Sequence, residues 1–237
     1  KSKIISKFHA IKKLGYVKSH RRNNTGIGKT FEDYIGVIEN NIDNPDLFGF
    51  EIKSHREFAQ SYVTLFSKNP SFPKGANTYL KNKYGTPYEN NPELKRIHTS
   101  MFANKANNYA GKFAFQLIND KNDKCIYIAV FSLRTKKIID RSCGYTYDDL
   151  KKVLTRKLKN LFYVTAETKK DKTGTEYFFF NKAEIYENPS FEKFLSLIDK
   201  GLIMYDIRIG SYQSGSNYGK THDHGSGFRK KKKNLNK

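Results

Sequence analysis

The stretch of sequence that decides the fold is NPDLFGFEIKSH, residues 44–55. Its second half alternates apolar and polar residues, which is typical of a half-buried β-strand. Residues i and i+2 of a strand share a face, so Glu51 and Lys53 project together while their apolar neighbours point into the core. Asp46 stands at the start of this strand, near enough to share a site with Glu51. The pattern therefore predicts two carboxylates and one lysine gathered at one strand.

These three side chains suit a particular chemistry. Two neighbouring carboxylates repel unless a cation lies between them, and hard oxygen ligands favour Mg²⁺, which also accepts phosphate oxygens. A lysine beside such an ion can orient a water molecule or neutralise charge in the transition state. The set therefore indicates metal-assisted hydrolysis of phosphodiesters. The same spacing also arises by accident on a solvated strand face, and the spacing alone leaves that alternative open.

Just upstream, residues 24–32 read NTGIGKTFE and raise the question of nucleotide binding. A P-loop needs a glycine, four residues and then Gly-Lys-Ser/Thr, between a buried strand and a helix. Asn23 occupies the position of that first glycine, and the preceding VKSHRRNN is a polar, basic loop. We therefore expect no ATP binding. The glycines are interpreted as a tight turn into a helix that is capped by Thr30 and carries Glu32, a further polar group for the site.

The charge balance points to a polyanionic partner. The chain has 237 residues, of which 44 are basic and 23 acidic, giving a formal net charge of +21. Such a field attracts nucleic acid first and an acidic membrane surface second, although a merely soluble basic protein is the alternative. No apolar run reaches the roughly 18 residues of a membrane span. Two cysteines support neither a disulfide framework nor a zinc cluster, so a reducing, cytoplasmic setting is expected.

The remaining periodicity predicts a mixed α/β or α+β fold. We expect helices at 3–14, 147–161 and 190–201, the last two capped by Thr146 and Ser190, and a helix with buried Phe31, Ile35 and Ile38. Strands are expected at 48–54, 61–67 and 202–210, and as hairpins at 112–118 with 125–133 and at 162–168 with 176–186. Tyr62, Phe66 and the run 178–180 are interpreted as core. Residues 72–85 and 211–228 are expected to be irregular.

Several blocks together closely resemble the MvaI/BcnI group of type II restriction endonucleases, which is similar in turn to the mismatch-repair nickase MutH. The resemblance covers most of the chain, from about residue 24 to 229, and is strongest in its two end blocks. It is carried by NTGIGKTFED, NPDLFGFEIKSH, LFSKNP, GANTYLKNKYG and DIRIGSYQSGSNYGKTHDHGSGFR.

The resemblance implies a PD-(D/E)xK nuclease core, with two lobes that grip a DNA duplex from opposite grooves. By the family motif, Asp46 and Glu51 would be the Mg²⁺ ligands and Lys53 would lie beside the attacking water. Glu32 matches the helix glutamate that completes the active site. The implied reaction is direct attack by a metal-associated water, leaving a 5′-phosphate and a 3′-hydroxyl. Family members act as monomers on double-stranded DNA and cut the two strands of CCNGG-type sites in turn.

The distal block suits base recognition. Arginine fits guanine O6 and N7, and an aspartate can accept from cytosine N4. The expected DNA-reading residues are Arg208, Tyr212, Lys220, His222, Asp223, His224 and Arg229. The alternatives for this block are a metal site at His222 and His224 or a flexible glycine-rich loop. Near residues 68–83, backbone or minor-groove contacts are expected from Lys68, Lys74, Asn77, Lys81 and Lys83, with a solvated basic loop as the alternative.

These expectations assemble into one reading with two alternatives. Residues 1–165 would form the catalytic lobe, 166–229 the DNA-recognition lobe, and 230–237 a basic tail that adds non-specific affinity. The protein would be a bacterial, cytoplasmic restriction endonuclease that needs neither ATP nor a membrane. The alternatives are a MutH-like nickase that depends on a partner protein, and a DNA-binding module without catalysis. The intact set of Glu32, Asp46, Glu51 and Lys53 argues against the latter.

Overall fold

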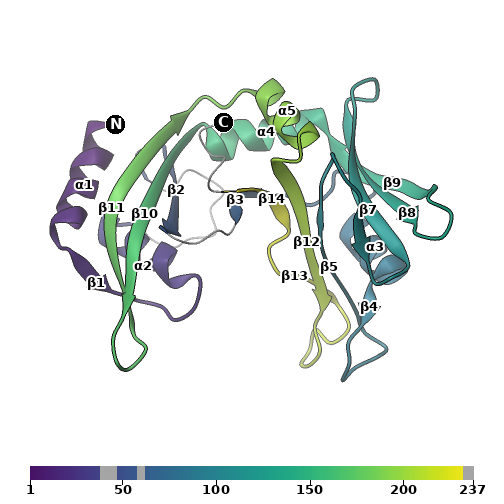
Figure 1. Ribbon diagram of the computed structural model, residues 1–237, viewed down its shortest axis with the longest axis horizontal. Coiled ribbons are helices and arrows are strands. Elements are labelled where there is room, and N and C mark those ends of the chain that lie inside the picture. The colour runs from purple at the N-terminus through teal and green to yellow at the C-terminus, as the bar shows by residue number, and fades with distance from the viewer. Residues whose placement is uncertain (38–46, 58–61, 232–237) are drawn as a thin grey trace. The chain divides into compact units, whose positions relative to one another are not determined.

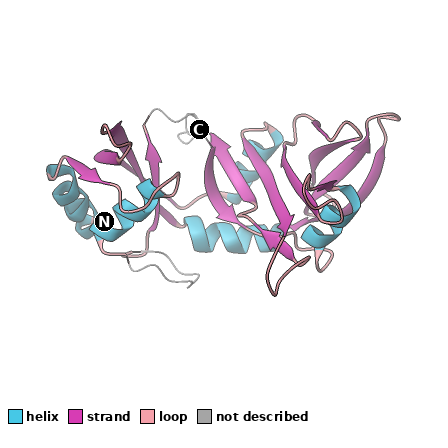
Figure 2. Ribbon diagram, turned by 90° about the horizontal axis from the view of Figure 1, so that it is seen from below, coloured by secondary structure: helices cyan, strands magenta, loops and turns pink. Residues whose placement is uncertain are grey.

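The computed structural model describes residues 1–37, 47–57 and 62–231. Helices and strands are interspersed along the chain, so the fold is mixed α+β, as the sequence predicts (Figure 2). The chain divides into two compact units, each built from two separate segments. Unit 1 comprises residues 1–61 and 154–189, and unit 2 comprises residues 62–153 and 190–237.

Unit 1 is built on a four-stranded sheet in the order β1-β11-β10-β2 (Figure 1). Its two long strands form the antiparallel hairpin predicted from the sequence, and β2 pairs in parallel with β10 at the sheet edge. The elements of this unit are α1 (Ser2–Lys13), β1 (Tyr16–Lys18), α2 (Gly26–Ile35), β2 (Glu51–Arg56), β10 (Asn160–Lys170) and β11 (Glu176–Glu187).

Both helices of unit 1 pack on one face of this sheet. The rings of Phe8 in α1 and Phe31 in α2 lie with their centroids 5.9 and 6.4 Å from that of Phe162 in β10. Ile52 of β2 is the register partner of Phe162 and belongs to the same buried cluster. Because side chains alternate along a strand, Glu51 and Lys53 lie on the opposite face of the sheet.

Unit 2 contains two sheets. The first has the order β3-β14-β12-β5-β4, with β13 also pairing β12, and the second has the order β6-β7-β8-β9. The first sheet consists of β3 (Tyr62–Ser67), β4 (Thr86–Pro87), β5 (Lys95–Met101), β12 (Ile203–Ser211), β13 (Thr221–Asp223) and β14 (Gly227–Lys231). The second consists of β6 (Asn107–Tyr109), β7 (Phe113–Asp120), β8 (Cys125–Ser132) and β9 (Ile138–Thr146). The remaining helices are α3 (Ala76–Tyr84), α4 (Tyr147–Leu158), whose last turn belongs to unit 1, and α5 (Phe191–Asp199).

An aromatic cluster forms the core of unit 2 around Phe228. The rings of Phe66, Tyr145, Phe194 and Tyr205 lie with their centroids 5.1 to 5.6 Å from that of Phe228. All five side chains are buried, which confirms the interpretation of Phe66 as core. Burial of so much aromatic surface strongly stabilises the sheet that contains β12 and β13.

The N-terminal helix caps predicted at Thr146 and Ser190 are confirmed. The hydroxyl of Thr146 accepts the backbone N–H of Asp149 in the first turn of α4. The hydroxyl of Ser190 accepts the backbone N–H of Lys193 in α5. Both bonds satisfy amides that have no partner inside the helix, which is why these residue types begin helices.

The start of α2 differs from the prediction. The helix begins at Gly26, after Thr25, so Thr30 lies inside it and is no cap. The buried Thr30 hydroxyl instead accepts the backbone N–H of His20 at 2.9 Å. Gly26 is needed for close packing, because a Cβ there would lie 2.2 Å from the carbonyl oxygen of Arg21. Ile38, expected in the buried stripe, lies outside the described residues.

Three further expectations are corrected. Residues 76–84 of the supposedly irregular basic segment form α3, and the distal block contains β13 and the start of β14. The basic tail does not begin at residue 230, because Lys230 is buried within β14. The expected division at residue 165 falls inside β10, whose hairpin partner β11 lies in the same unit.

No helix in the described part of the chain is long and apolar enough to cross a membrane.

Candidate functional site

The edge strand β2 brings two of the predicted catalytic side chains into direct contact. Lys53 donates from Nζ to Oε1 of Glu51 at 2.5 Å. In the parallel pairing with β10, Glu51 lies beside Leu161 and Lys53 beside Tyr163. The two charged groups therefore occupy one patch of the sheet face opposite to the one on which α1 and α2 pack.

Burial makes this pair electrostatically significant. The Glu51 side chain is 9% exposed and that of Lys53 is 31% exposed. A carboxylate removed from water needs a cation or several hydrogen bonds, because desolvation of an unpaired charge is costly. Lys53 supplies that cation while its own ammonium still reaches solvent. The arrangement can therefore hold a negatively charged substrate group at the Lys53 end.

Glu32 lies on α2, which packs against β2 through its apolar face. The Glu32 side chain is half-buried. Its carboxylate points toward the preceding turn of α2, since a Cβ on Gly28 would lie 3.8 Å from Glu32 Oε1. Asp46, the remaining predicted catalytic residue, lies outside the described residues.

The residues present fit a hard divalent cation. Glu51 offers a buried carboxylate oxygen, the ligand type that Mg²⁺ prefers. Asp46 would be the second ligand. The described residues contain no group of three or more His, Cys, Asp or Glu side chains that could hold a metal by themselves.

The lysine of the GIGKT string has a structural partner. Lys29 donates to Asp33 one turn further along α2, at 2.7 Å, and the His20 ring nitrogen Nδ1 lies 2.8 Å from the other Asp33 oxygen. The hydrogen bonds from Lys29 and His20 lower the pKa of Asp33 below its ordinary value. This string therefore builds the beginning of the helix that carries Glu32.

In unit 2, two predicted DNA-reading arginines converge on one buried carboxylate. Arg208 donates from Nε to Asp206 Oδ2 at 2.6 Å, and Arg229 Nε forms an ion pair with the same oxygen at 3.2 Å. Asp206 is 4% exposed and also accepts from Ser100. The Arg208 side chain is 50% exposed. Because Nε is held from behind, the two terminal nitrogens of Arg208 point outward as a fork suited to guanine.

Beside this fork lies a stack of aromatic rings. Tyr212 and His222 stack with centroids 4.3 Å apart and planes 9° from parallel, and His224 lies 4.1 Å from His222. His98 of β5 extends the row, with its centroid 5.9 Å from that of His224. Burial lowers the pKa of both His98 and His224, so at pH 7 these rings are neutral and can each donate and accept.

Sequence reasoning missed His98, because its place in this row depends on pairing across the sheet. β5 and β12 are far apart in the chain, and their register sets His98 opposite Arg208. The alternation of RIHTSM at residues 96–101 could have indicated a strand. Nothing local could have indicated which strand it would join.

The helix α3 corrects two of the expected DNA contacts. Lys81 is 3% exposed, and its ammonium donates to the hydroxyl of Ser211 at 2.8 Å. Asn77 is 9% exposed, and its amide donates to Asn69 at 2.9 Å and to Asp223 at 3.4 Å. Both side chains lie behind the strands β12 and β13 and face away from any ligand on their outer surface. They support β12 and β13 from the side of the sheet that faces α3.

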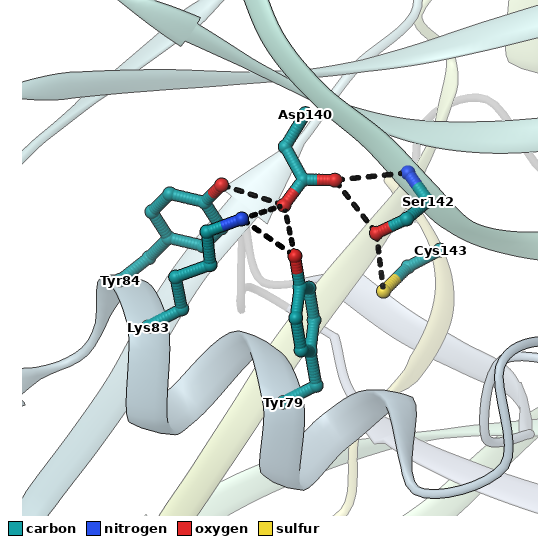
Figure 3. Close-up of polar contacts among 6 residues, drawn as sticks. All are labelled: Tyr79, Lys83, Tyr84, Asp140, Ser142 and Cys143. Atoms are coloured by element: carbon teal, nitrogen blue, oxygen red, sulfur yellow. Dashed lines mark hydrogen bonds and ion pairs between the residues drawn. The ribbon is translucent and has the colours of Figure 1, made fainter.

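Lys83 is exposed but engaged by the carboxylate of Asp140 in β9, 2.9 Å away (Figure 3). The same carboxylate accepts from the hydroxyls of Tyr79, Tyr84 and Ser142. This network joins the helix α3 to the second sheet. Lys83 therefore helps to join α3 to β9, and its contact with DNA stays a prediction. Lys74 and Lys220 are exposed, and Lys220 donates to Asn217 at 3.1 Å, so their surface positions are those expected of phosphate contacts.

A family model and solved structures are similar to this chain over nearly its whole length. Residues 5–237 match the family model described as the MvaI/BcnI restriction endonuclease family. A solved complex of restriction endonuclease MvaI with its cognate DNA substrate is 35% identical, with 96% of this chain and 91% of that chain covered and a TM-score of 0.87. MvaI in the absence of DNA is 34% identical, with 97% and 91% covered and a TM-score of 0.64. No curated protein matches the chain.

Proposed function

Because this chain belongs to the MvaI/BcnI restriction endonuclease family, we propose that it is a Mg²⁺-dependent enzyme cleaving double-stranded DNA at a CCNGG-type site as a monomer. The chain is a site-specific DNA endonuclease with a restriction-endonuclease fold. The observation that carries the mechanism is the contact between Glu51 and Lys53 on β2. The DNA partner is supported by the similarity to MvaI, which has been solved with its cognate DNA.

The proposed chemistry is direct hydrolysis without a covalent enzyme intermediate. Restriction endonucleases generally use divalent metal ions, and a Mg²⁺ ion held by Asp46 and Glu51 would supply Lewis acidity toward the scissile phosphate. Lys53 is fixed by Glu51 and is proposed to position the attacking water and neutralise developing charge. Glu32 is proposed to orient that water or Lys53 from α2.

Base recognition is assigned to the outer surface around β12 and β13. The Arg208 fork is proposed to bind guanine. Asp223 pairs with Ile209, so its side chain lies on the side of the sheet that faces α3, where its Oδ2 accepts from Asn77. Asp223 Oδ1 already accepts the backbone N–H groups of Gly225 and Ser226, which fixes its direction. The row of rings through Tyr212 and His222 offers flat surfaces beside these polar groups.

The test is digestion of plasmid DNA with Mg²⁺, with EDTA as the metal-free control, followed by sequencing of the ends. We expect discrete fragments whose ends fall within a CCNGG-type site and carry 5′-phosphates. Nicked circles as the final product would favour a MutH-like nickase. Binding without cleavage in any divalent metal would overturn the catalytic assignment. The variant Lys53→Met tests whether cleavage depends on β2, and Lys12→Met, on the exposed side of α1, is its control.

A further inference from the structure

One side of α3 contacts both strands of the ribbon formed by β12 and β13. Lys81 donates from Nζ to the hydroxyl of Ser211, the last residue of β12, at 2.8 Å. The hydroxyl of Thr78 donates to that of Thr221, the first residue of β13, at 2.9 Å. The bond from Asn77 described above is a third contact with β13. Residues three and four positions apart lie on the same side of a helix, so α3 holds the ribbon at three points.

Ser211 is the residue at which most of these bonds meet. It is buried, and its hydroxyl donates to the carbonyl oxygen of Lys95 in β5 at 3.0 Å while it accepts from α3. Its backbone N–H donates to the hydroxyl of Tyr88 at 3.2 Å. Ser211 is also the register partner of Thr221, and this pair closes the loop of residues 212–220. Ser211 therefore fixes the base of the loop between β12 and β13.

The base of this loop carries two of the stacked rings on the outer surface. Side chains alternate along a strand, so the residues that follow Ser211 and Thr221 point away from α3. Those residues are Tyr212 and His222, whose ring centroids lie 4.3 Å apart. The backbone N–H of Tyr212 donates to the carbonyl oxygen of Lys220 at 3.0 Å, so the pairing continues past Ser211. A displacement of Ser211 would therefore move the stacked rings as well.

A lysine is a costly residue for the contact between a helix and a sheet. Lys81 is 3% exposed, and burial lowers the pKa of its ammonium below the ordinary value. That ammonium donates to a neutral hydroxyl and not to a carboxylate. One such bond offsets only part of the desolvation of a charged group, so an apolar side chain of the same length would cost less. Residues that break a folding rule in this way are expected where function requires them.

We propose that Lys81 is a positioning residue for base recognition, which acts through its bond to Ser211 and does not contact DNA. This inference rests on the proposed function, because the outer surface around β12 and β13 is the one assigned to base recognition. Hydrogen bonds weaken steeply when their geometry is lost, so groups that read bases need a backbone fixed from behind. Lys81 therefore affects affinity for the target sequence and not affinity for DNA in general.

The test is a double-mutant cycle on DNA affinity, measured by fluorescence anisotropy in EDTA. Its variants are Lys81→Met, Ser211→Ala and the two together. The control is Ile128→Val, a buried residue of β8 in the second sheet, which loses stability away from the ribbon. Each protein is titrated with a duplex that contains the cleaved site and with an unrelated duplex, at salt concentrations from about 50 to 200 mM.

Lys81→Met should lower affinity for the target duplex by about 10-fold or more, the effect of losing one hydrogen bond from a charged group. Ser211→Ala and the double variant should each show about the same loss, because either substitution removes the same bond. Affinity for the unrelated duplex, and its dependence on salt, should match those of the wild type. Ile128→Val should keep the wild-type ratio of the two affinities.

Equal losses on both duplexes, with a salt slope smaller by about 0.9, would mean that Lys81 contacts a phosphate and would overturn the proposal. Losses that add in the double variant would also overturn it. Hydrogen exchange of the amides in residues 212–223 tests the same bond without DNA. Exchange should be faster in Lys81→Met than in the wild type or Ile128→Val, and unchanged exchange would contradict the proposal. A wild-type protein that binds both duplexes equally would count against the proposed function, whereas the exchange result would still decide the role of Lys81.

Discussion

At the scale of single residues, the contact between Glu51 and Lys53 makes the proposed catalytic role and the stability of the protein testable together. Lys53→Met should lower the cleavage rate by at least about 10²-fold, because the charge beside the scissile phosphate is lost. It should also destabilise the protein by about 1–3 kcal/mol, since the buried Glu51 carboxylate then has no cation. Urea unfolding and single-turnover cleavage measure the two effects.

A double variant separates these roles. Glu51→Gln/Lys53→Met removes both charges and should recover most of the lost free energy of unfolding while cleavage stays absent. The two side chains are not energetically coupled if the double variant loses as much free energy of unfolding as Glu51→Gln and Lys53→Met lose together. The short contact on β2 would then carry no mechanistic meaning.

Arg208 makes a prediction about specificity. Arg208→Lys keeps the charge but loses the fork that Asp206 holds in place, so affinity for the cognate site should fall by about 1–3 kcal/mol. Affinity for unrelated DNA should be unchanged. Arg134→Lys, at an exposed turn of unit 2, is the matched control. Equal losses on cognate and unrelated duplexes would show that Arg208 contacts only phosphate.

At the scale of elements, the attachment of α3 to β9 depends on Asp140. Burial alone would raise the pKa of this carboxyl, but hydrogen bonds from Ser142, Tyr79 and Tyr84 hold it well below the ordinary value of 3.8. A lowered pKa in the folded state stabilises the fold above about pH 4, and this contribution is lost as the pH falls further. Asp140→Asn should therefore cost about 2–3 kcal/mol at pH 7 and progressively less in acid.

Urea unfolding at pH 7 and at several values below pH 4 measures this dependence. Asp148→Asn on the exposed side of α4 is the control, and it should cost under about 1 kcal/mol at any of these values. A pH-independent loss in Asp140→Asn would mean that the network contributes through packing and not through the carboxylate charge.

What the sequence predicts about elements depends on how local the signal is. The alternation at 48–54 and the caps at Thr146 and Ser190 are local patterns, and the structure has the strand and both caps. α3 was missed because it is 9 residues long and stands between Gly75 and Gly85, which together indicate a loop. Neighbours cannot indicate that Lys81 is buried, because its partner Ser211 lies 130 positions away.

The candidate site shows the same limit. Contact between Glu51 and Lys53 follows from their spacing on a strand, so it could be predicted. The basic segment SHRRNN was visible too, but not that Arg56 and Glu176 would tie it to the hairpin of β10 and β11. His98 and Asp206 gain their roles only from the register of β12 against its neighbours. Long-range pairing decides these roles, and a single sequence does not show it.

At the scale of the whole molecule, a monomer that presents one catalytic pair should cut the two DNA strands in separate events. Supercoiled plasmid should pass through a nicked circle before it becomes linear, and the rate should rise in proportion to enzyme concentration. Sedimentation should give the mass of a single 27.5 kDa chain. A rate that rises with the square of the concentration would indicate a dimer at the moment of cleavage.

The path of the chain between its two units also constrains how this protein can evolve. The chain passes from one unit to the other at 61/62, 153/154 and 189/190, so neither unit is a single continuous piece of the gene. A lone crossover before residue 190 would therefore exchange segments of both units at once, and one just after residue 190 would separate β12 and β13 from β5, the strand that pairs with β12. New target sequences must accumulate by substitution, side chain by side chain, on a surface whose supporting strands are already inherited.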